Sequence, residues 1–353
     1  MGELRVIECR GGAGERGRSH GEQLRNEVRD FYAAWVDYTC SQSGATEPDL
    51  ISYAGAHLPA SREYAPELVE ELEGIAAGAG VPFESIFLMN CFDEVACHGP
   101  SIIKAGLHGC TAFAATGVAT ADGRSYVGQG WDMPPLCPPY LLRLIGDDQP
   151  DALLVSHPGL VGGTGVNEHG LAIVWNTLKA KDVGLGVPAL FVARKALQAT
   201  ELAELVGNVI GSQRANGMNF VAADSVAAIN LELSATRYHT TYCTGILAHA
   251  NHFEAPEFLE LEADSPLVAP DTLLRSGRMR VLLEEKRGLI DLEALQSIMA
   301  DHAGGPGSIC RHNSKGFATV VSVIYVPSER AMWATNGNPC VEPFMRYSLE
   351  AEE

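Results

Sequence analysis

The sequence predicts a layered fold of the α/β or α+β class with mostly antiparallel sheets. Apolar residues recur every three or four positions through most of the first 105 residues, which is typical of amphipathic helices. After Cys110 the pattern changes to short apolar runs separated by turn residues, which is typical of strands. Helical segments return between groups of strands, so the chain runs from strands to helices and back to strands.

The first 105 residues are expected to be mainly helical. Residues 20–40 place apolar side chains on one helix face, and 65–81 begins with Ala-Pro-Glu and ends in Gly78 and Gly80. Residues 82–97 form a further apolar helical candidate. Glycines and a proline interrupt 98–109, which predicts a linker or an exposed loop.

Strands are expected from Cys110 onward. Two strands, 110–119 and 124–133, are joined by a turn through Asp122-Gly123, a strong hairpin signal. The later segments are predicted in this order: strands at 151–159 and 170–178, a helix at 188–210, strands at 217–225, 226–235 and 237–243, helices at 270–288 and 291–302, and a closing hairpin at 316–337.

Composition and charge exclude several classes of partner. The formal net charge is −19, which argues against nucleic acid and anionic membranes, because both attract an excess of Lys and Arg. We see neither a secretory signal nor a run of 18 apolar residues, so no transmembrane helix is expected. Nine scattered cysteines fit a disulfide framework poorly and favour a reduced, cytoplasmic protein.

Cys110 is the leading candidate for a nucleophile. The alternative without a catalytic role is a small buried hydrophobic residue, which is the commonest role of a free cysteine. Gly109 before it permits a tight backbone, Thr111 after it supplies a hydroxyl, and the change from helices to strands falls at this point. These features suggest that the thiolate attacks the Gly109 carbonyl and that water then releases an N-terminal Cys110. Its α-amine, with a reference pKa of about 7.7–8.0, would serve as the base.

Polar residues elsewhere could complete such a site. Asp132 ends the second hairpin strand, so antiparallel pairing brings it to Cys110, where it could face the new ammonium group. Asn176 stands in an otherwise apolar strand, and the Asn251 amide could donate to an oxyanion. Arg275 and Arg278 lie one helical turn apart and could bind a carboxylate or orient the acid. The alternatives without a catalytic role are ordinary turn residues for Asp132 and Asn251 and a solvated helix face for the two arginines.

A metal site is weakly indicated. Two groups of potential ligands occur, but neither contains a CxxC pair or an HExxH motif. The glycine-rich stretch 159–170 lacks the Gly-Lys-Ser/Thr of a phosphate-binding loop. We therefore expect no metal and no cofactor, and we keep a zinc-dependent hydrolase as a remote alternative. The two groups are Cys91, Cys97, His98, His108 and Cys110, and His249 with His252.

Several motifs together resemble a known family. "GCTAFA", "DGRSYVGQGWDM", "GVNEHGLAIVWNTL", "GMNFVAAD" and "ANHF" look like the acyl-coenzyme A:isopenicillin N acyltransferase-like family, peptidase family C45, among the N-terminal-nucleophile hydrolases. The likeness extends upstream through "GRSHGEQLR" and "ELEGIAAGAGV". It continues downstream through "SICR" and "ATVVSVIYVPSERAMWATNGNPC", and so covers nearly the whole chain. Choloylglycine-hydrolase-like enzymes are a more distant relative.

The resemblance implies a four-layer αββα sandwich and self-cleavage between Gly109 and Cys110. Residues 1–109 would be a helical pro-segment and 110–353 the catalytic chain, the two forming one globular unit. Cys110 would be the nucleophile, Asp132 its acidic partner and Asn251 the oxyanion amide. One departure concerns the pocket: the family commonly has Asn before "WD", where this chain has Gly130.

The resemblance also implies supporting residues and an activity. Asn176 matches a substrate or oxyanion amide less securely, and Arg275 matches an arginine only loosely, with Arg278 an equal contender. The expected activity is that of a thiol amidohydrolase or acyltransferase, and we favour hydrolysis of a small amide. Acyl-coenzyme A would be a substrate of the transferase. A heterodimer of the two processed chains is expected, further self-association stays open, and a non-catalytic binding module is the third alternative.

Overall fold

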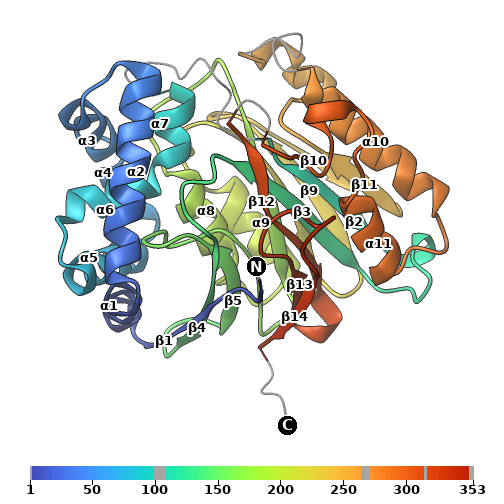
Figure 1. The fold of residues 1–353 in the computed structure, drawn as a ribbon, viewed down its shortest axis with the longest axis horizontal. Coiled ribbons are helices and arrows are strands. Elements are labelled where there is room, and N and C mark those ends of the chain that lie inside the picture. Colours follow the sequence, from blue (N-terminus) through green and yellow to red (C-terminus); the bar gives the residue numbers. More distant parts are fainter. Residues whose placement is uncertain (1, 99–108, 264–269, 314–315, 350–353) are drawn as a thin grey trace.

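The computed structural model describes residues 2–98, 109–263, 270–313 and 316–349 (Figure 1). Two β-sheets form the centre of this part of the chain. The first sheet has eight strands, in which β1 pairs parallel with β4 and all other neighbours are antiparallel. Its strands in spatial order are β1 (Val6–Gly11), β4 (Tyr140–Gly146), β5 (Ala152–Ser156), β6 (Thr164–Asn167), β7 (Ala172–Leu178), β8 (Gly217–Ala223), β9 (Ala228–Leu233) and β10 (Tyr238–Tyr242).

The second sheet has six antiparallel strands in the described residues. Its central hairpin is the one predicted through Asp122-Gly123. The strands in spatial order are β11 (Ile246–His249), β2 (Thr111–Ala115), β3 (Tyr126–Met133), β12 (Ala318–Val326), β13 (Ala331–Ala334) and β14 (Met345–Ser348). β2 and β3 pack against β7 and β8, so the two sheets are stacked face to face.

Seven helices precede the first hairpin in the described residues, so this region is mainly helical as expected, although the single helix predicted at 82–97 is two helices. They are α1 (Ala13–Gln23), α2 (Arg25–Ser43), α3 (Glu47–Gly55), α4 (Leu58–Tyr64), α5 (Pro66–Ala79), α6 (Phe83–Asn90) and α7 (Phe92–His98). Later helices are α8 (Ala189–Ala196), α9 (Leu202–Ile210), α10 (Asp271–Glu285) and α11 (Leu292–Met299). Short 3₁₀ turns lie at Gly117–Ala119, Pro256–Leu261, Gly305–Gly307 and Pro327–Glu329.

Helices cover the outer face of each sheet, which completes four layers. α1, α8 and α9 pack on the first sheet, whereas α10 and α11 pack on the second. Figure 1 shows the N-terminal helices on one side of the sheets and α10 and α11 on the other. The expected α+β class with mostly antiparallel sheets in an αββα arrangement is therefore confirmed.

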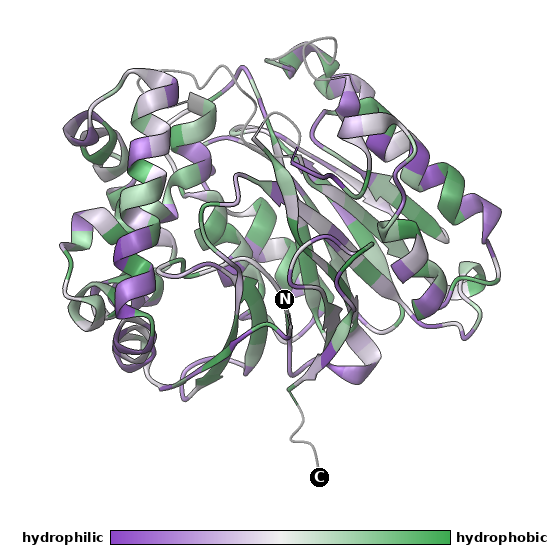
Figure 2. Ribbon diagram, viewed as in Figure 1, coloured by the Kyte–Doolittle hydropathy of each residue, from purple (hydrophilic) through white to green (hydrophobic). Residues whose placement is uncertain are grey.

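Apolar burial follows this layering. Figure 2 shows hydrophobic residues along the central strands and hydrophilic ones on the outward helix faces. The main apolar cluster joins both sheets to the N-terminal helices, and a second one lies between the second sheet and α10 and α11. None of the described helices combines the length and apolarity needed to cross a membrane.

Several elements differ from the prediction. Residues 6–11 form a strand whose alternation buries Ile7 and Cys9, a period-2 pattern that the helical interpretation overlooked. The helix expected at 188–210 is two helices, and Thr200 in the connection between them donates its backbone N–H and its hydroxyl to the Glu204 carboxylate in the first turn of α9. β4, β6, β11 and β14 were not predicted. Most of the expected linker at 98–109 lies outside the described residues.

Candidate active site

The hairpin of β2 and β3 places Cys110 beside Asp132. Thr111 pairs with Gly130, and the Gly109 backbone N–H donates to the Asp132 carbonyl oxygen at 3.3 Å. The antiparallel register therefore carries on past the first residue of β2, as the sequence predicted. Cys110 is buried, with 4% of its surface exposed. The expected nucleophile and its acidic partner thus occupy the same end of the hairpin.

The Asp132 carboxylate is buried and partly neutralised. Its Oδ1 accepts a hydrogen bond from the Thr319 hydroxyl at 2.6 Å, and its Oδ2 lies 3.4 Å from Nε of Arg311. Burial raises the pKa of Asp132 to about 6, although Arg311 and Arg275 oppose that increase. At neutral pH the carboxyl group is mostly ionised, so a negative charge stands beside Cys110.

Arg311 is a site residue that sequence reasoning missed. Its guanidinium pairs with the carboxylates of Asp132 and Asp271. It also lies against the backbone of Gly109, because a methyl group on that glycine would come within 3.1 Å of the guanidinium carbon. "SICR" contributed to the family resemblance, and membership of that motif was the only signal available for its arginine.

Arg275 of α10 binds the start of β2. Its Nη1 donates to the Cys110 carbonyl oxygen at 2.5 Å and to the Thr111 hydroxyl at 2.9 Å, and its Nη2 donates to Asn251 Oδ1 at 3.1 Å. One buried guanidinium therefore connects three of the residues that the sequence nominated. The fork-like geometry of arginine suits this arrangement of acceptors.

Arg278, the alternative to Arg275, lies elsewhere. Its guanidinium donates two hydrogen bonds to the Asp301 carboxylate, at 3.1 and 2.8 Å. The two arginines share α10 but point to different partners, and only Arg275 contacts the residues around Cys110.

The two nominated asparagines occupy different settings. Asn251 follows β11, where its Nδ2 donates to the Thr177 carbonyl oxygen at 3.1 Å and its backbone N–H to the Thr272 hydroxyl at 2.7 Å. Asn176 is buried on β7 and accepts a hydrogen bond from Asn219 Nδ2 at 3.3 Å. The Nδ2 of Asn176 is buried without a hydrogen-bond partner. It is a donor that a substrate oxygen could use.

The thiol of Cys110 is protonated in the intact chain. Burial raises its pKa to about 12 and the Asp132 charge adds to this, while hydrogen bonds from the Asp132 backbone and the Gln129 side chain act in the opposite sense. Because the thiolate is the attacking form, reaction at Cys110 requires a base close to the sulfur.

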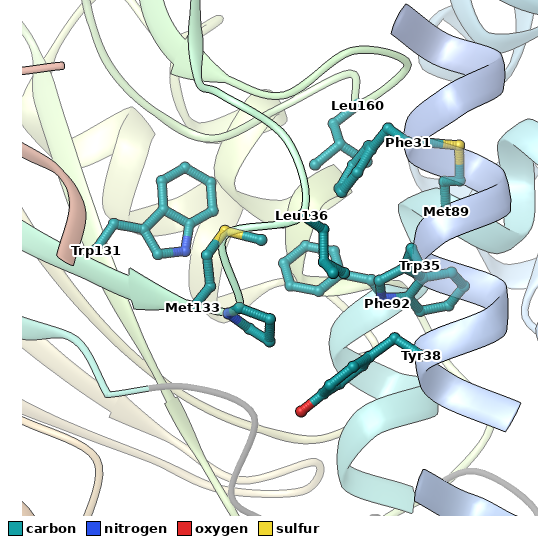
Figure 3. Close-up of a pocket in the computed structure, with 10 residues that line it drawn as sticks. Phe31, Trp35, Tyr38, Met89, Phe92, Trp131, Met133, Leu136 and Leu160 are labelled. Carbon is teal, nitrogen blue, oxygen red and sulfur yellow. The ribbon is translucent and has the colours of Figure 1, made fainter. Parts of the chain in front are cut away.

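A narrow apolar pocket lies on the same side of the second sheet as the thiol. Trp131 and Met133 flank Asp132 on β3, and because side chains alternate along a strand they share the face opposite that carboxylate. Cys110 and Trp131 belong to the same buried cluster. Figure 3 shows Trp131 and Met133 on one side of the pocket and aromatic residues of α2 on the other. The lining residues are Phe31, Trp35, Tyr38, Met89, Phe92, Trp131, Met133, Pro134, Leu136 and Leu160.

The histidines of the zinc alternative have other partners. His249 Nε2 lies 2.7 Å from Glu232 Oε1 and its Nδ1 lies 2.8 Å from the Ala250 carbonyl oxygen. His252 Nδ1 is 2.9 Å from the Thr272 hydroxyl. His108 lies outside the described residues. Among the described residues, the cysteines nominated with it do not form a group of metal ligands.

Comparison with known proteins decides the family. The model of the family "Acyl-coenzyme A:6-aminopenicillanic acid acyl-transferase" matches residues 122–340, which is more than half of the sequence. The chain belongs to this enzyme family. The matched region contains Asp132, Asn251, Arg275 and Arg311 but begins after Cys110, so the match itself does not include the candidate nucleophile.

The chain is also similar to individual known proteins. The acyl-coenzyme A:6-aminopenicillanic-acid-acyltransferase 40 kDa form of Emericella nidulans is 25% identical over 319 residues, which cover 88% of this chain and 85% of that protein. Penicillin V acylase from Agrobacterium tumefaciens has a TM-score of 0.44 at 9% identity, covering 68% of this chain and 86% of that one. Conjugated bile acid hydrolase from Clostridium perfringens has a TM-score of 0.39 at 12% identity, covering 69% and 99%.

Proposed function

We propose that the protein is a self-processing thiol enzyme that forms an acyl-thioester on Cys110. The observation that carries the proposal is the position of Cys110, at the start of a hairpin strand, between Gly109 and Thr111 and beside Asp132. The activity that fits best is hydrolysis of a small amide with an apolar acyl group. Its alternative is transfer of that group to an amine.

Self-cleavage would begin with attack of the Cys110 sulfur on the Gly109 carbonyl carbon. The peptide C–N bond breaks, the thiol proton passes to the departing amine, and a thioester joins the two segments. Water then hydrolyses the thioester, which leaves a carboxylate on Gly109 and a free α-amine and thiol on Cys110. Arg311, packed on Gly109, would place positive charge near the oxyanion of this step.

Substrate turnover would use the same sulfur with a new base. The α-amine released by cleavage has a reference pKa of about 7.7–8.0, so it can accept the thiol proton near neutral pH. Asp132 would pair with that amine once it is protonated. Asn251 would donate to the oxyanion, and Arg275 would hold Asn251 and the Cys110 carbonyl in place.

The apolar pocket would receive the acyl group. Its aromatic residues suit an aryl or alkyl chain and would exclude water around it. Hydrolysis needs only that one water reaches the thioester, whereas transfer needs a second binding site for an amine. The name shared by the family and the Emericella nidulans relative favours transfer as the second candidate.

Intact mass of the purified protein tests the cleavage. We expect the wild type to separate under denaturing conditions into chains of residues 1–109 and 110–353, and Cys110→Ala to remain one chain. Cys137→Ser is the matched control, because that thiol is half-buried and contacts only the nearby Pro138 carbonyl oxygen in its hydrogen bonding. Cleavage in Cys110→Ala, or an uncut wild type after prolonged incubation, would overturn the assignment.

Product analysis separates the two activities. The processed enzyme is incubated with amides that carry phenylacetyl or short polar acyl groups, with and without 6-aminopenicillanic acid as the acceptor. Free acid in every reaction supports the hydrolase, and a new amide formed only with the acceptor supports the transferase. Equal rates for apolar and polar acyl groups would rule out the pocket as the acyl site.

A further inference from the structure

Four side chains that could bind a metal ion lie close together beside the second sheet, and they are not among the hydrogen-bond partners described above for Cys110. His302 follows α11, Cys310 and His312 precede β12, and Cys340 follows β13. One ligand atom from each lies within 4.8 Å of every other, and this is the one such group in the described residues. We propose that these four residues bind a zinc ion that holds this region of the fold together.

Four of the six distances between the ligand atoms are close to those of a tetrahedral site, and the other two are within 4.8 Å. Zn–S bonds are about 2.3 Å and Zn–N bonds about 2.0–2.1 Å, so the edges of a tetrahedron are about 3.8 Å between sulfurs and about 3.3 Å between nitrogens. The Sγ atoms of Cys310 and Cys340 are 3.6 Å apart, and the Nε2 atoms of His302 and His312 are 3.0 Å apart. The mixed edge from His312 Nε2 to Cys340 Sγ is 3.1 Å.

Hydrogen bonds alone account poorly for this arrangement. His312 Nε2 lies within reach of His302 Nε2, Cys310 Sγ and Cys340 Sγ, at 3.0, 3.8 and 3.1 Å. A single ring nitrogen carries one hydrogen or one lone pair, so it cannot serve all three. A disulfide is also absent between the two cysteines, since its S–S bond would be about 2.05 Å. One central cation interacts with all four atoms at once.

The ligand chemistry selects zinc. Two thiolates and two neutral imidazoles neutralise a divalent ion, and tetrahedral S₂N₂ coordination is characteristic of Zn²⁺. Each cysteine loses its thiol proton to solvent when the metal binds. Four protein ligands leave no open position for water or substrate, so the ion would be structural and distinct from a zinc hydrolase centre.

The surroundings already orient the ligands. The Cys310 carbonyl oxygen accepts a hydrogen bond from the Ser308 hydroxyl at 2.7 Å, and Asn338 Nδ2 lies 3.5 Å from Cys310 Sγ. The same Asn338 amide donates to the Arg311 carbonyl oxygen at 2.7 Å. Such outer contacts are typical of built metal sites. Because Arg311 lies between two ligands in sequence, the ion would also fix the segment that brings its guanidinium to Gly109.

Metal content of the full-length protein tests the proposal. The protein is purified with a tag free of histidines and without chelators, incubated with zinc sulfate, desalted and analysed by mass spectrometry for metals. We expect one zinc ion per chain in the wild type and in Cys137→Ser. Cys340→Ser and His312→Ala are expected to lose at least nine-tenths of the bound zinc. A chelator should lower the melting temperature of the wild type but not of Cys340→Ser.

Other results would overturn the site. The proposal is wrong if the folded wild type retains no zinc after incubation. It is also wrong if peptides from protein prepared under reducing conditions contain Cys310 and Cys340 joined by a disulfide. If the variants fail to fold, the test uses the wild type with cobalt bound in place of zinc. Thiolate-to-cobalt charge transfer with tetrahedral d–d bands supports the proposal, and octahedral bands contradict it. None of these measurements depends on cleavage at Cys110.

Discussion

At the scale of single residues, the site rests on a largely buried network of two acids and two cations, of which Asp271 is the partly exposed member. Arg311 pairs with Asp132 and Asp271, and Asp271 lies 3.6 Å from Arg275. Equal numbers of opposite charges offset part of the cost of burying them, although such groups seldom add net stability. The network is therefore better explained by the chemistry proposed at Cys110 than by a gain in stability.

Asp132 should make the uncut chain less stable as pH rises. Burial raises its pKa from 3.8 to about 6, so the folded state holds the proton more tightly than the unfolded state does. That contribution is fully present below pH 4 and is lost as pH rises through 6. In a Cys110→Ala background, Asp132→Asn should gain about 2–3 kcal/mol relative to its parent between pH 4 and 7, measured by urea unfolding.

Asp271→Asn is the control of opposite sign. Although burial acts to raise its pKa, Arg275 and Arg311 hold the pKa of Asp271 below its usual value. Its ionised form therefore stabilises the fold at neutral pH, and that contribution is lost as pH falls. The Asn variant should lose stability relative to the parent as pH rises. A flat difference for Asp132→Asn across this range would contradict the raised pKa.

At the scale of elements, sequence reasoning succeeded where the signal was local. The turn through Asp122-Gly123 and the apolar alternation around it specified the β2–β3 hairpin, and that hairpin sets the register between Gly109 and Asp132. Gly80 ends α5 in a left-handed conformation with φ of 66°, as a helix stop was expected to do.

Features that depend on distant parts of the chain were not predictable in this way. Arg311 reaches Asp132 only because β12 lies beside β3, a pairing that no local pattern encodes. The proposed zinc ligands are spaced His-x7-Cys-x-His-x27-Cys, which has none of the paired spacing of common zinc motifs. The expectation of no metal rested on a search for short motifs, whereas the proposed ligands come from two connections, α11 to β12 and β13 to β14.

The contact between α1 and α5 also depends on glycines whose role was not evident. Gly78 was expected to help end α5, yet it lies within the helix, against the backbone of Arg18. Gly74 faces Gly14 in the same way. A methyl group on Gly74 would lie 2.4 Å from the Gly14 carbonyl oxygen and 2.8 Å from the Arg18 nitrogen, so the two backbones touch.

Gly74→Ala should therefore destabilise the protein by about 1–3 kcal/mol, because backbone atoms cannot move aside as a flexible side chain can. Urea unfolding of the Cys110→Ala chain measures the loss. Gly207→Ala on α9 is the matched control, since a methyl group there meets nothing within 4 Å. That variant should gain about 0.5–1 kcal/mol from improved helix propensity. A Gly74→Ala variant as stable as its parent would show that the helices can separate at no cost.

At the scale of the whole molecule, the segment before the proposed cleavage point is built into the core. Glu71 of α5 accepts hydrogen bonds from Arg16 of α1, at 3.2 and 3.3 Å, and from Arg194 of α8 at 3.4 Å. Asn90 of α6 binds the Gly159 carbonyl oxygen at 2.9 Å. Buried polar contacts and the shared apolar cluster thus join residues on both sides of Gly109.

Cleavage should consequently leave the two chains together. We expect residues 1–109 and 110–353 to elute as one complex in size-exclusion chromatography and to separate only in denaturant. Glu71→Gln should lower the free energy of unfolding by about 3–5 kcal/mol, because it removes the carboxylate that pairs with the buried Arg194 and leaves the buried Arg16 paired with Asp148 alone. Glu73→Gln, on the exposed face of the same helix, should change it by less than about 0.5 kcal/mol.

The ranking of these two variants can be measured in the uncut Cys110→Ala chain as well as in the cleaved complex. We expect Glu71→Gln to be the more destabilising variant in both forms, because the contacts of Glu71 do not involve the residues at the cleavage point. If the two chains separate in native buffer after cleavage, the N-terminal helices are held to the rest of the fold mainly by the peptide bond between Gly109 and Cys110. In that case the N-terminal segment would act as a removable pro-segment, and the wall of the apolar pocket formed by α2 would be lost with it.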